Sequence, residues 1–265
     1  MKSSLVYSLP KSVYKYSKKQ IELSKELQES IKKNFQQMNS GATKFSNQEQ
    51  FSVCHAKYED GVLHFDLALT DYAHYLFTMK NPQIDNPCIS VAANCIVETS
   101  DKYLVVAKMH ASTSLAGKLK FIGGAISKDD LTNDNFDLEK AARRELLEEV
   151  GIPLTFYDED SQENKNLLLT RPGVNFYNNL FYVKSSLSKT KFYSFFEKYN
   201  NALKEKGENE LEDIVFIRNE PDSIIEFLNS NTFDSVEYFD DCLKVIAKVI
   251  KPGNIIETLK AMGRI

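Results

Sequence analysis

The stretch of sequence that decides the fold runs Arg144-Glu145-Leu146-Leu147-Glu148-Glu149-Val150-Gly151-Ile152. At about 100° per residue, Glu148 and Glu149 fall within about 60° of Glu145 on a helix, so the three carboxylates share one side. Carboxylates this close repel each other unless a cation lies among them. Because hard divalent ions such as Mg²⁺ and Mn²⁺ prefer oxygen ligands, the pattern indicates a metal site of the kind usually employed on phosphate groups.

The same side of this helix is apolar toward its start. Leu138, Ala141 and Ala142 project from the arc that carries the glutamates, so this arc should face protein rather than water. Asp137 can cap the start of the helix, and Gly151 can take the left-handed conformation just past its end. A solvated face is the commoner origin of a glutamate-rich helix end, but the apolar continuation argues against it here.

Two glycines precede the helix, in Phe121-Ile122-Gly123-Gly124, where the backbone can turn tightly and offer a carbonyl to a metal or an N–H to a phosphate. Together with the helix, they resemble the Nudix box, a loop and helix of the pattern Gly-x5-Glu-x7-Arg-Glu-U-x-Glu-Glu-x-Gly-U, where U is a bulky aliphatic residue. The second half of this pattern matches at every fixed position, from Arg144 to Ile152.

The first half departs from the family in spacing and in one residue. Six more residues than the family's spacing allows separate Gly124 from Arg144, which predicts a loop insertion within residues 127–135. Phe136 stands at the register position of the family's early glutamate, with Asp137 beside it. The resemblance assigns that glutamate a mainly structural role, so we expect metal binding to survive its loss.

Length and composition are typical of a soluble enzyme or binding domain. The 265 residues suffice for one large domain with an extension, and a hydrophobic content of 42% can build a core. The net charge of −4 gives no electrostatic reason to expect a nucleic-acid partner. We also expect no membrane partner, because the sequence has no long apolar run. The lack of a signal-peptide core and of any C-x-x-C pair predicts a cytoplasmic protein with reduced thiols.

The periodicity of the chain predicts strands, then the box helix, further strands and a C-terminal helix. Before the box we expect a helix over 17–38, a hairpin of strands 51–58 and 62–69, a short helix over 70–77, and paired strands 89–97 and 103–108. After the box we expect strands 167–170, 176–183 and 213–217, with helices 192–203 and 235–250. With the resemblance, this order predicts a mixed α/β (α+β) fold, a Nudix-type α/β/α sandwich around a mixed sheet. We expect an N-terminal extension at 1–86, packed on a Nudix hydrolase domain at 87–265.

The N-terminal segment carries a second, looser resemblance. Leu69-Thr70-Asp71-Tyr72, shortly before the first strand of the box domain, is similar to the extension of Nudix enzymes that hydrolyse UDP-glucose and UDP-galactose. Packing over the sheet, or a homodimer interface, would explain the extension equally well.

The resemblance implies hydrolysis of a diphosphate joined to another moiety. Bound Mg²⁺, for which Mn²⁺ could substitute, would neutralise phosphate charge and lower the pKa of an attacking water. Metal ligation is implied for Glu145, Glu148, Glu149 and the Gly123 carbonyl. Arg144 is implied to pair with a neighbouring carboxylate and fix its rotamer.

The family also places a general base in a loop before a late strand. Glu208, Glu210 and Glu212 stand there, with Glu212 closest by register, although a solvated loop explains this charged run equally well. Lys120, Arg171 and the Gly124 N–H are candidates for phosphate contacts.

The expected substrate is a small-molecule nucleotide, a nucleoside diphosphate linked to another group. UDP-sugars are favoured, and compounds like ADP-ribose come next. The missing early glutamate and the stretched loop leave an alternative, a catalytically weak Nudix domain that binds a nucleotide as a regulatory module.

Overall fold

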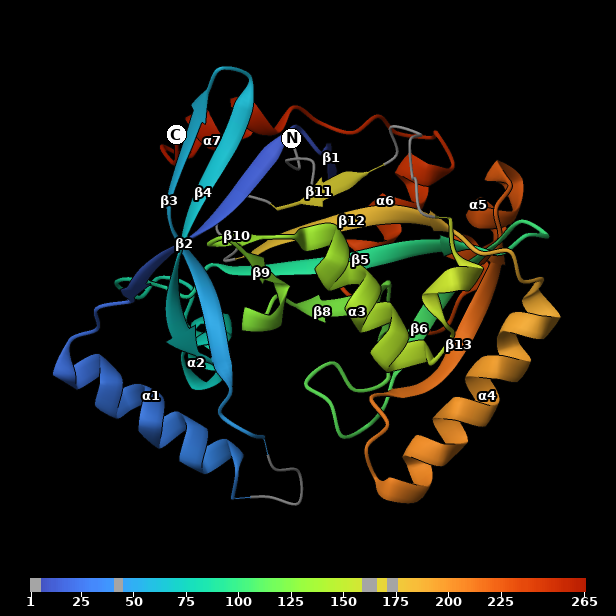
Figure 1. Cartoon of the computed structure of the whole chain (residues 1–265), viewed down its shortest axis with the longest axis horizontal. Coiled ribbons are helices and arrows are strands. Elements are labelled where there is room, and N and C mark those ends of the chain that lie inside the picture. Colours follow the sequence, from blue (N-terminus) through green and yellow to red (C-terminus); the bar gives the residue numbers. More distant parts are fainter. Residues whose placement is uncertain (1–5, 41–44, 159–165, 171–175) are drawn as a thin grey trace.

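A mixed β-sheet runs through the part of the chain that the computed structural model describes, residues 6–40, 45–158, 166–170 and 176–265 (Figure 1). The strands around its centre are β5 (Ser90–Glu98), β6 (Tyr103–Met109), β7 (Leu119–Lys120), β8 (Ile122–Ala125), β11 (Leu167–Leu169), β12 (Phe176–Lys184) and β13 (Leu211–Arg218). Strand β5 pairs in parallel with β12 and antiparallel with β6 and β8. The short strand β1 (Val6–Ser8) continues the sheet beyond β11.

Helices cover both faces of this sheet. They are α3 (Leu138–Val150), α4 (Lys189–Lys206), α5 (Pro221–Ser230), α6 (Phe239–Ile246) and α7 (Ile255–Ala261). Cys95 of β5 belongs to the hydrophobic cluster that contains Leu146 of α3 and Phe192 of α4. Ile96, the next residue, belongs to the cluster that contains Phe239 of α6. Because successive strand residues point to opposite faces, the sheet lies between two helical layers, which confirms the α/β/α sandwich.

The N-terminal region contributes strands to the same sheet. Strands β3 (Glu49–Glu59) and β4 (Val62–Asp71) form the predicted hairpin. Asp60 and Gly61 between them have φ angles of 50° and 78°, as a two-residue hairpin turn of type I′ requires. Strand β3 reaches β5 at the pair Ser52 and Ser90, so the sheet is continuous with the strands around β5. The predicted short helix is α2 (Tyr72–Lys80).

The predicted helix over 17–38 is wrong in its first part. Residues Ser12–Gln20 form strand β2, which pairs in parallel with β4, and helix α1 spans only Lys25–Met38. The Ser24 hydroxyl accepts a hydrogen bond from the Leu27 N–H at 3.2 Å and so caps α1 at its start. The C-terminal helix is also shorter than the predicted 235–250, since α6 ends at Ile246. No helix in the described ranges is long and apolar enough to span a membrane.

The predicted insertion folds as a small hairpin. A single 3₁₀ turn, η1 (Lys128–Asp130), leads into the short strands β9 (Leu131–Thr132) and β10 (Asn135–Phe136). Strand β10 pairs with β2 at Asn135 and Lys15. The insertion therefore links the N-terminal region to the start of α3.

Candidate active site

Helix α3 is held in one orientation by its two ends and by its buried face. The Asp137 carboxylate accepts a hydrogen bond from the Lys140 N–H at 3.0 Å, and Gly151 has the left-handed φ of 71°. A Cβ at Gly151 would overlap the ring of Tyr199 on α4. Leu146 is fully buried in the core, and Glu145 and Glu149 on the same helix reach strand β8.

Close contacts require both glycines of β8. Gly123 has a φ of 140°, and a Cβ there would overlap the Ala93 carbonyl. A Cβ at Gly124 would overlap the carboxylate of Glu145. The Gly123 N–H also donates a hydrogen bond to Glu149 Oε2 at 3.0 Å. The structure thus brings Glu145 and Glu149 directly against the glycine pair.

Lys120 of β7 reaches the same place. Its Nζ lies 3.3 Å from Glu149 Oε1 and also donates a hydrogen bond to the Gly123 carbonyl. The side chains of Lys120 and Glu149 are only 10% and 4% exposed. Lys120, a candidate phosphate contact, therefore lies between two candidate metal ligands.

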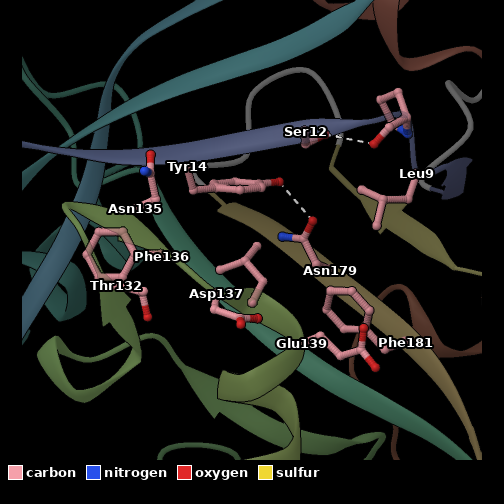
Figure 2. Close-up of a pocket in the computed structure, with 12 residues that line it drawn as sticks. Leu9, Ser12, Tyr14, Thr132, Asn135, Phe136, Asp137, Glu139, Asn179 and Phe181 are labelled. Atoms are coloured by element: carbon pink, nitrogen blue, oxygen red, sulfur yellow. Dashed lines mark hydrogen bonds between the residues drawn. The ribbon is translucent and has the colours of Figure 1, made fainter. Parts of the chain in front are cut away.

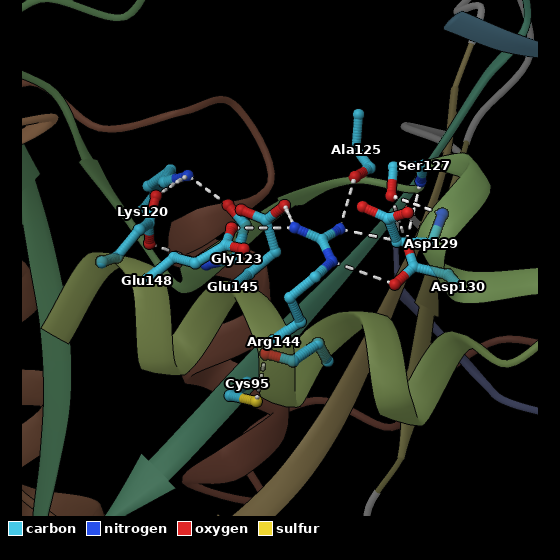
Figure 3. Close-up of polar contacts among 12 residues, drawn as sticks. Cys95, Lys120, Gly123, Ala125, Ser127, Asp129, Asp130, Arg144, Glu145 and Glu148 are labelled. Carbon is cyan, nitrogen blue, oxygen red and sulfur yellow. Dashed lines mark hydrogen bonds and ion pairs between the residues drawn. The ribbon is translucent and has the colours of Figure 1, made fainter. Parts of the chain in front are cut away.

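Arg144 connects the box glutamates to the insertion (Figure 3). Its Nε and Nη2 each lie 3.0 Å from an oxygen of Asp130, a bidentate pair. Its Nη1 lies 2.8 Å from Glu145 Oε1 and 2.9 Å from Glu148 Oε2. The guanidinium therefore restrains both carboxylates, in line with the role implied for the box arginine.

Asp130 is the site residue that sequence reasoning missed. It is fully buried, and it accepts a hydrogen bond from the Ser127 N–H at 2.8 Å, so it also fixes the 3₁₀ turn η1. Phe136, at the register position of the early glutamate, instead packs against Phe51 with ring centroids 4.7 Å apart. The sequence signal was the spacing of Ser127 and Asp130, which is that of a capping box.

Burial makes the two inner glutamates harder to ionise. Desolvation raises the pKa of Glu145 to about 7, against the Arg144 guanidinium that lowers it and with the Glu149 charge that raises it further. Desolvation likewise raises the pKa of Glu149, while Lys120 and the Gly123 N–H oppose the rise. A nearby cation would therefore stabilise the ionised form of both carboxylates.

The oxygen donors at Gly123 fit a divalent ion, although the carboxylates are not gathered around one point. Among the described residues, no group of three or more His, Cys, Asp or Glu side chains is placed to hold a metal ion. The Gly123 carbonyl and Glu149 nevertheless share one cationic atom, Lys120 Nζ, and Glu145 lies against Gly124. Oxygen donors of this kind suit Mg²⁺ or Mn²⁺. Glu148 is 58% exposed at its side chain and pairs with Arg144.

The structure describes the two candidates for the general base, Glu210 and Glu212, but not the candidate phosphate contact Arg171. Glu212 on β13 faces Lys108 of β6 at 3.6 Å, and its side chain is 48% exposed. Glu210, two residues earlier, is the acid whose charge raises the pKa of Glu149. Its charge on Glu149, and the pairing of Glu212 with Lys108, make Glu210 the stronger candidate of the two. Arg171 lies outside the described residues.

A separate hollow of about 470 Å³ lies beside the start of α3, between β2, β10 and β12 (Figure 2). The Tyr14 hydroxyl donates a hydrogen bond to Asn179 Oδ1 at 2.8 Å along one side of it. Asp137 and Glu139 border it, but Glu145, Glu148 and Glu149 do not. The hollow is therefore separate from the carboxylates of the box.

Comparisons with known proteins give remote similarities. No family model and no curated protein matches the chain. Among solved structures, it is similar to a Nudix hydrolase from Alicyclobacillus acidocaldarius, with 14% identity over 66% of this chain and 96% of that one, at a TM-score of 0.38. The MutT protein from Methanosarcina mazei Go1 is 15% identical over 61% of this chain and 95% of its own, at a TM-score of 0.37. DR0079 from Deinococcus radiodurans is 13% identical over 58% of this chain and 81% of its own, at a TM-score of 0.39.

Proposed function

We propose that this chain is a Nudix-type pyrophosphohydrolase, dependent on Mg²⁺, that cleaves the diphosphate of a nucleoside diphosphate linked to another moiety. The observation that carries the proposal is the contact between the α3 glutamates and the glycine pair of β8. Glu149 accepts the Gly123 N–H, and Glu145 fills the space that a side chain at Gly124 would take. These are the residues that match the Nudix box.

The chain's own oxygens would hold the ion. Glu149, Glu145 and the Gly123 carbonyl are the best-placed ligands, and Glu148 would join them only by turning away from Arg144. Bound Mg²⁺ would neutralise the phosphate charge and lower the pKa of the attacking water. Arg144, fixed by the buried Asp130, would hold the Glu145 carboxylate in place as the substrate enters.

A carboxylate outside α3 would accept the proton of the attacking water. Glu210 is the leading candidate, because its charge acts on Glu149. Glu212 is the alternative and would first have to leave Lys108. The Gly124 N–H and Lys120 would contact the phosphates, as would Arg171.

Nucleotide sugars, UDP-sugars above all, are the proposed substrates, with compounds like ADP-ribose next. The support is the resemblance of residues 69–72 to the extension of UDP-sugar hydrolases. In the structure this segment ends β4 and begins α2 at Tyr72, and the Tyr72 and Tyr75 rings stack with centroids 5.6 Å apart. Aromatic rings of this kind can bind a base or a sugar face.

The test is a substrate panel of UDP-glucose, ADP-ribose, NADH and nucleoside triphosphates, with Mg²⁺ or Mn²⁺. Hydrolysis of at least one of them should require the metal and should be abolished in Glu149→Gln, because a metal ligand is lost. Glu139→Gln is the matched control on the same helix, since Glu139 pairs with Arg143 instead. Turnover by Glu149→Gln at the wild-type rate would contradict the proposal.

A regulatory module that binds a nucleotide without cleaving it is the second candidate. The observation that favours it is Lys120, whose ammonium already compensates the charge of Glu149. Calorimetry with UDP-glucose and Mg²⁺, followed by product analysis of the same sample, separates the two. Binding heat without any phosphorylated product would support the module.

A further inference from the structure

The ammonium of Lys120 lies at the point where two of the proposed metal ligands converge. It donates a hydrogen bond to the Gly123 carbonyl and lies 3.3 Å from Glu149 Oε1. Strand β7 fixes its backbone, since Lys120 pairs with Ala107 of β6. The Lys120 side chain therefore extends from a fixed backbone position to an oxygen of β8 and an oxygen of α3.

A positive charge at this point compensates a buried negative one. The Glu149 side chain is 4% exposed, and an ionised carboxylate buried this deeply is costly without a partner. The Glu149 carboxylate accepts a hydrogen bond from the Gly123 N–H, and Lys120 supplies a positive charge beside it. A divalent ion bound to the same two oxygens would repel the ammonium and would need its space.

We propose that Lys120 is a built-in competitor of the divalent ion: its ammonium holds Gly123 and Glu149 together in the metal-free protein and leaves when the ion binds. This inference rests on the proposed function, because it takes its metal ligands from there. The lysine stem is a flexible four-carbon chain, so the ammonium can move while the backbone stays in β7. Once displaced, the ammonium stays within reach of the site, because its backbone remains in β7, and it is available to the phosphates of a substrate. Metal binding would thus favour binding of the anionic substrate.

Mn²⁺ binding to the metal-free protein tests the competition directly. The titration is followed by electron paramagnetic resonance of free Mn²⁺, in about 0.5 M KCl to screen the field of more distant charges. Lys120→Met should bind Mn²⁺ about tenfold more tightly than wild type, because apparent affinity is reduced by the fraction of molecules whose site is open. Lys118→Met, two residues away, is the control and should match wild type.

The variants also separate this inference from the proposed function. If Glu149→Gln weakens Mn²⁺ binding but Lys120→Met leaves it unchanged or weaker, the competition is overturned and the metal site stands. If Glu149→Gln leaves Mn²⁺ binding unchanged, the proposed metal site itself is wrong, and the competition fails with it.

Amine labelling of the wild-type protein gives a readout that needs no substitution. Acetylation by an activated ester, quantified by mass spectrometry, should be slow at Lys120 in the metal-free protein, because its ammonium is bound and its side chain is 10% exposed. Mg²⁺ should speed it several-fold, while Lys118 in the same segment keeps its rate. Equal rates at Lys120 with and without Mg²⁺, or a slower rate with Mg²⁺, would overturn the inference.

Discussion

At the scale of single residues, Asp130 is the anchor of the Arg144 guanidinium. It is fully buried and accepts two contacts of 3.0 Å from Arg144. Asp130→Asn keeps the size of the side chain but removes its charge. We expect a loss of about 2 kcal/mol in the free energy of unfolding, typical of a hydrogen bond to a charged group. Urea unfolding of the metal-free protein at neutral pH measures it. The exposed neighbour Asp129→Asn should lose less than about 0.5 kcal/mol, and equal losses in the two variants would refute the anchoring role.

The raised pKa of Glu145 should make metal binding depend on pH. Burial raises its pKa to about 7 in the folded protein, so it is protonated below that pH and ionised above it. Because a metal ligand must be deprotonated, Mn²⁺ should bind about tenfold more tightly at pH 8 than at pH 6. The raised pKa of Glu145 has the opposite effect on the stability of the fold, which falls as pH rises. Its contribution to stability is fully present below the unfolded pKa of about 4.5 and is lost as pH rises through about 7. Mn²⁺ titrations at pH 6 and pH 8 measure the change in affinity. If Mn²⁺ binding depends on pH as steeply in Glu145→Gln as in wild type, another group is responsible.

At the scale of elements, the end of α3 is set by one glycine. Gly151 and Gly207, which follow α3 and α4, both have φ of 71°, but only Gly151 has a side chain, that of Tyr199, in the place of a Cβ. Gly207→Ala should cost about 1 kcal/mol for the left-handed backbone alone. Gly151→Ala should cost about 1–3 kcal/mol more, because Tyr199 must also move. Urea unfolding of the two variants gives the comparison. Similar losses of stability in the two variants would mean that the Tyr199 ring moves aside at no cost in free energy.

The elements that could be predicted from the sequence are those with local signals. The turn at Asp60 and Gly61 and the ends of α3 at Asp137 and Gly151 are specified by residues within a few positions of each other. Strand β2 was mistaken for helix because its partners, β4 and β10, are distant in sequence. The same reason hid Asp130, whose contact with Arg144 depends on how the insertion folds back.

The candidate site was predictable to the same degree. The glutamates keep their spacing within α3, and the glycine pair is recognisable despite the insertion between them, so the resemblance to the Nudix box predicted that the two would meet. The position of Lys120 could not, because it depends on how β7 and β8 carry its ammonium past Gly123. Glu210 was ranked below Glu212 for a related reason. Strand β13 has a register shift between Leu211 and Asp213, which a regular strand pattern does not indicate.

At the scale of the whole molecule, the N-terminal region and α3 should lose structure together. Phe136 of β10 is 6% exposed and packs against Phe51 of β3 and Tyr16 of β2. Phe136→Ala should lower the free energy of unfolding by about 3–5 kcal/mol, as for other buried aromatic side chains. Because this ring joins strands of the N-terminal region to the start of α3, amide hydrogen exchange should speed up in both β3 and α3. Phe195→Ala, whose side chain is 43% exposed on α4, is the control and should leave both elements protected. Faster exchange in β3 alone would show that residues 1–86 unfold as a separate unit.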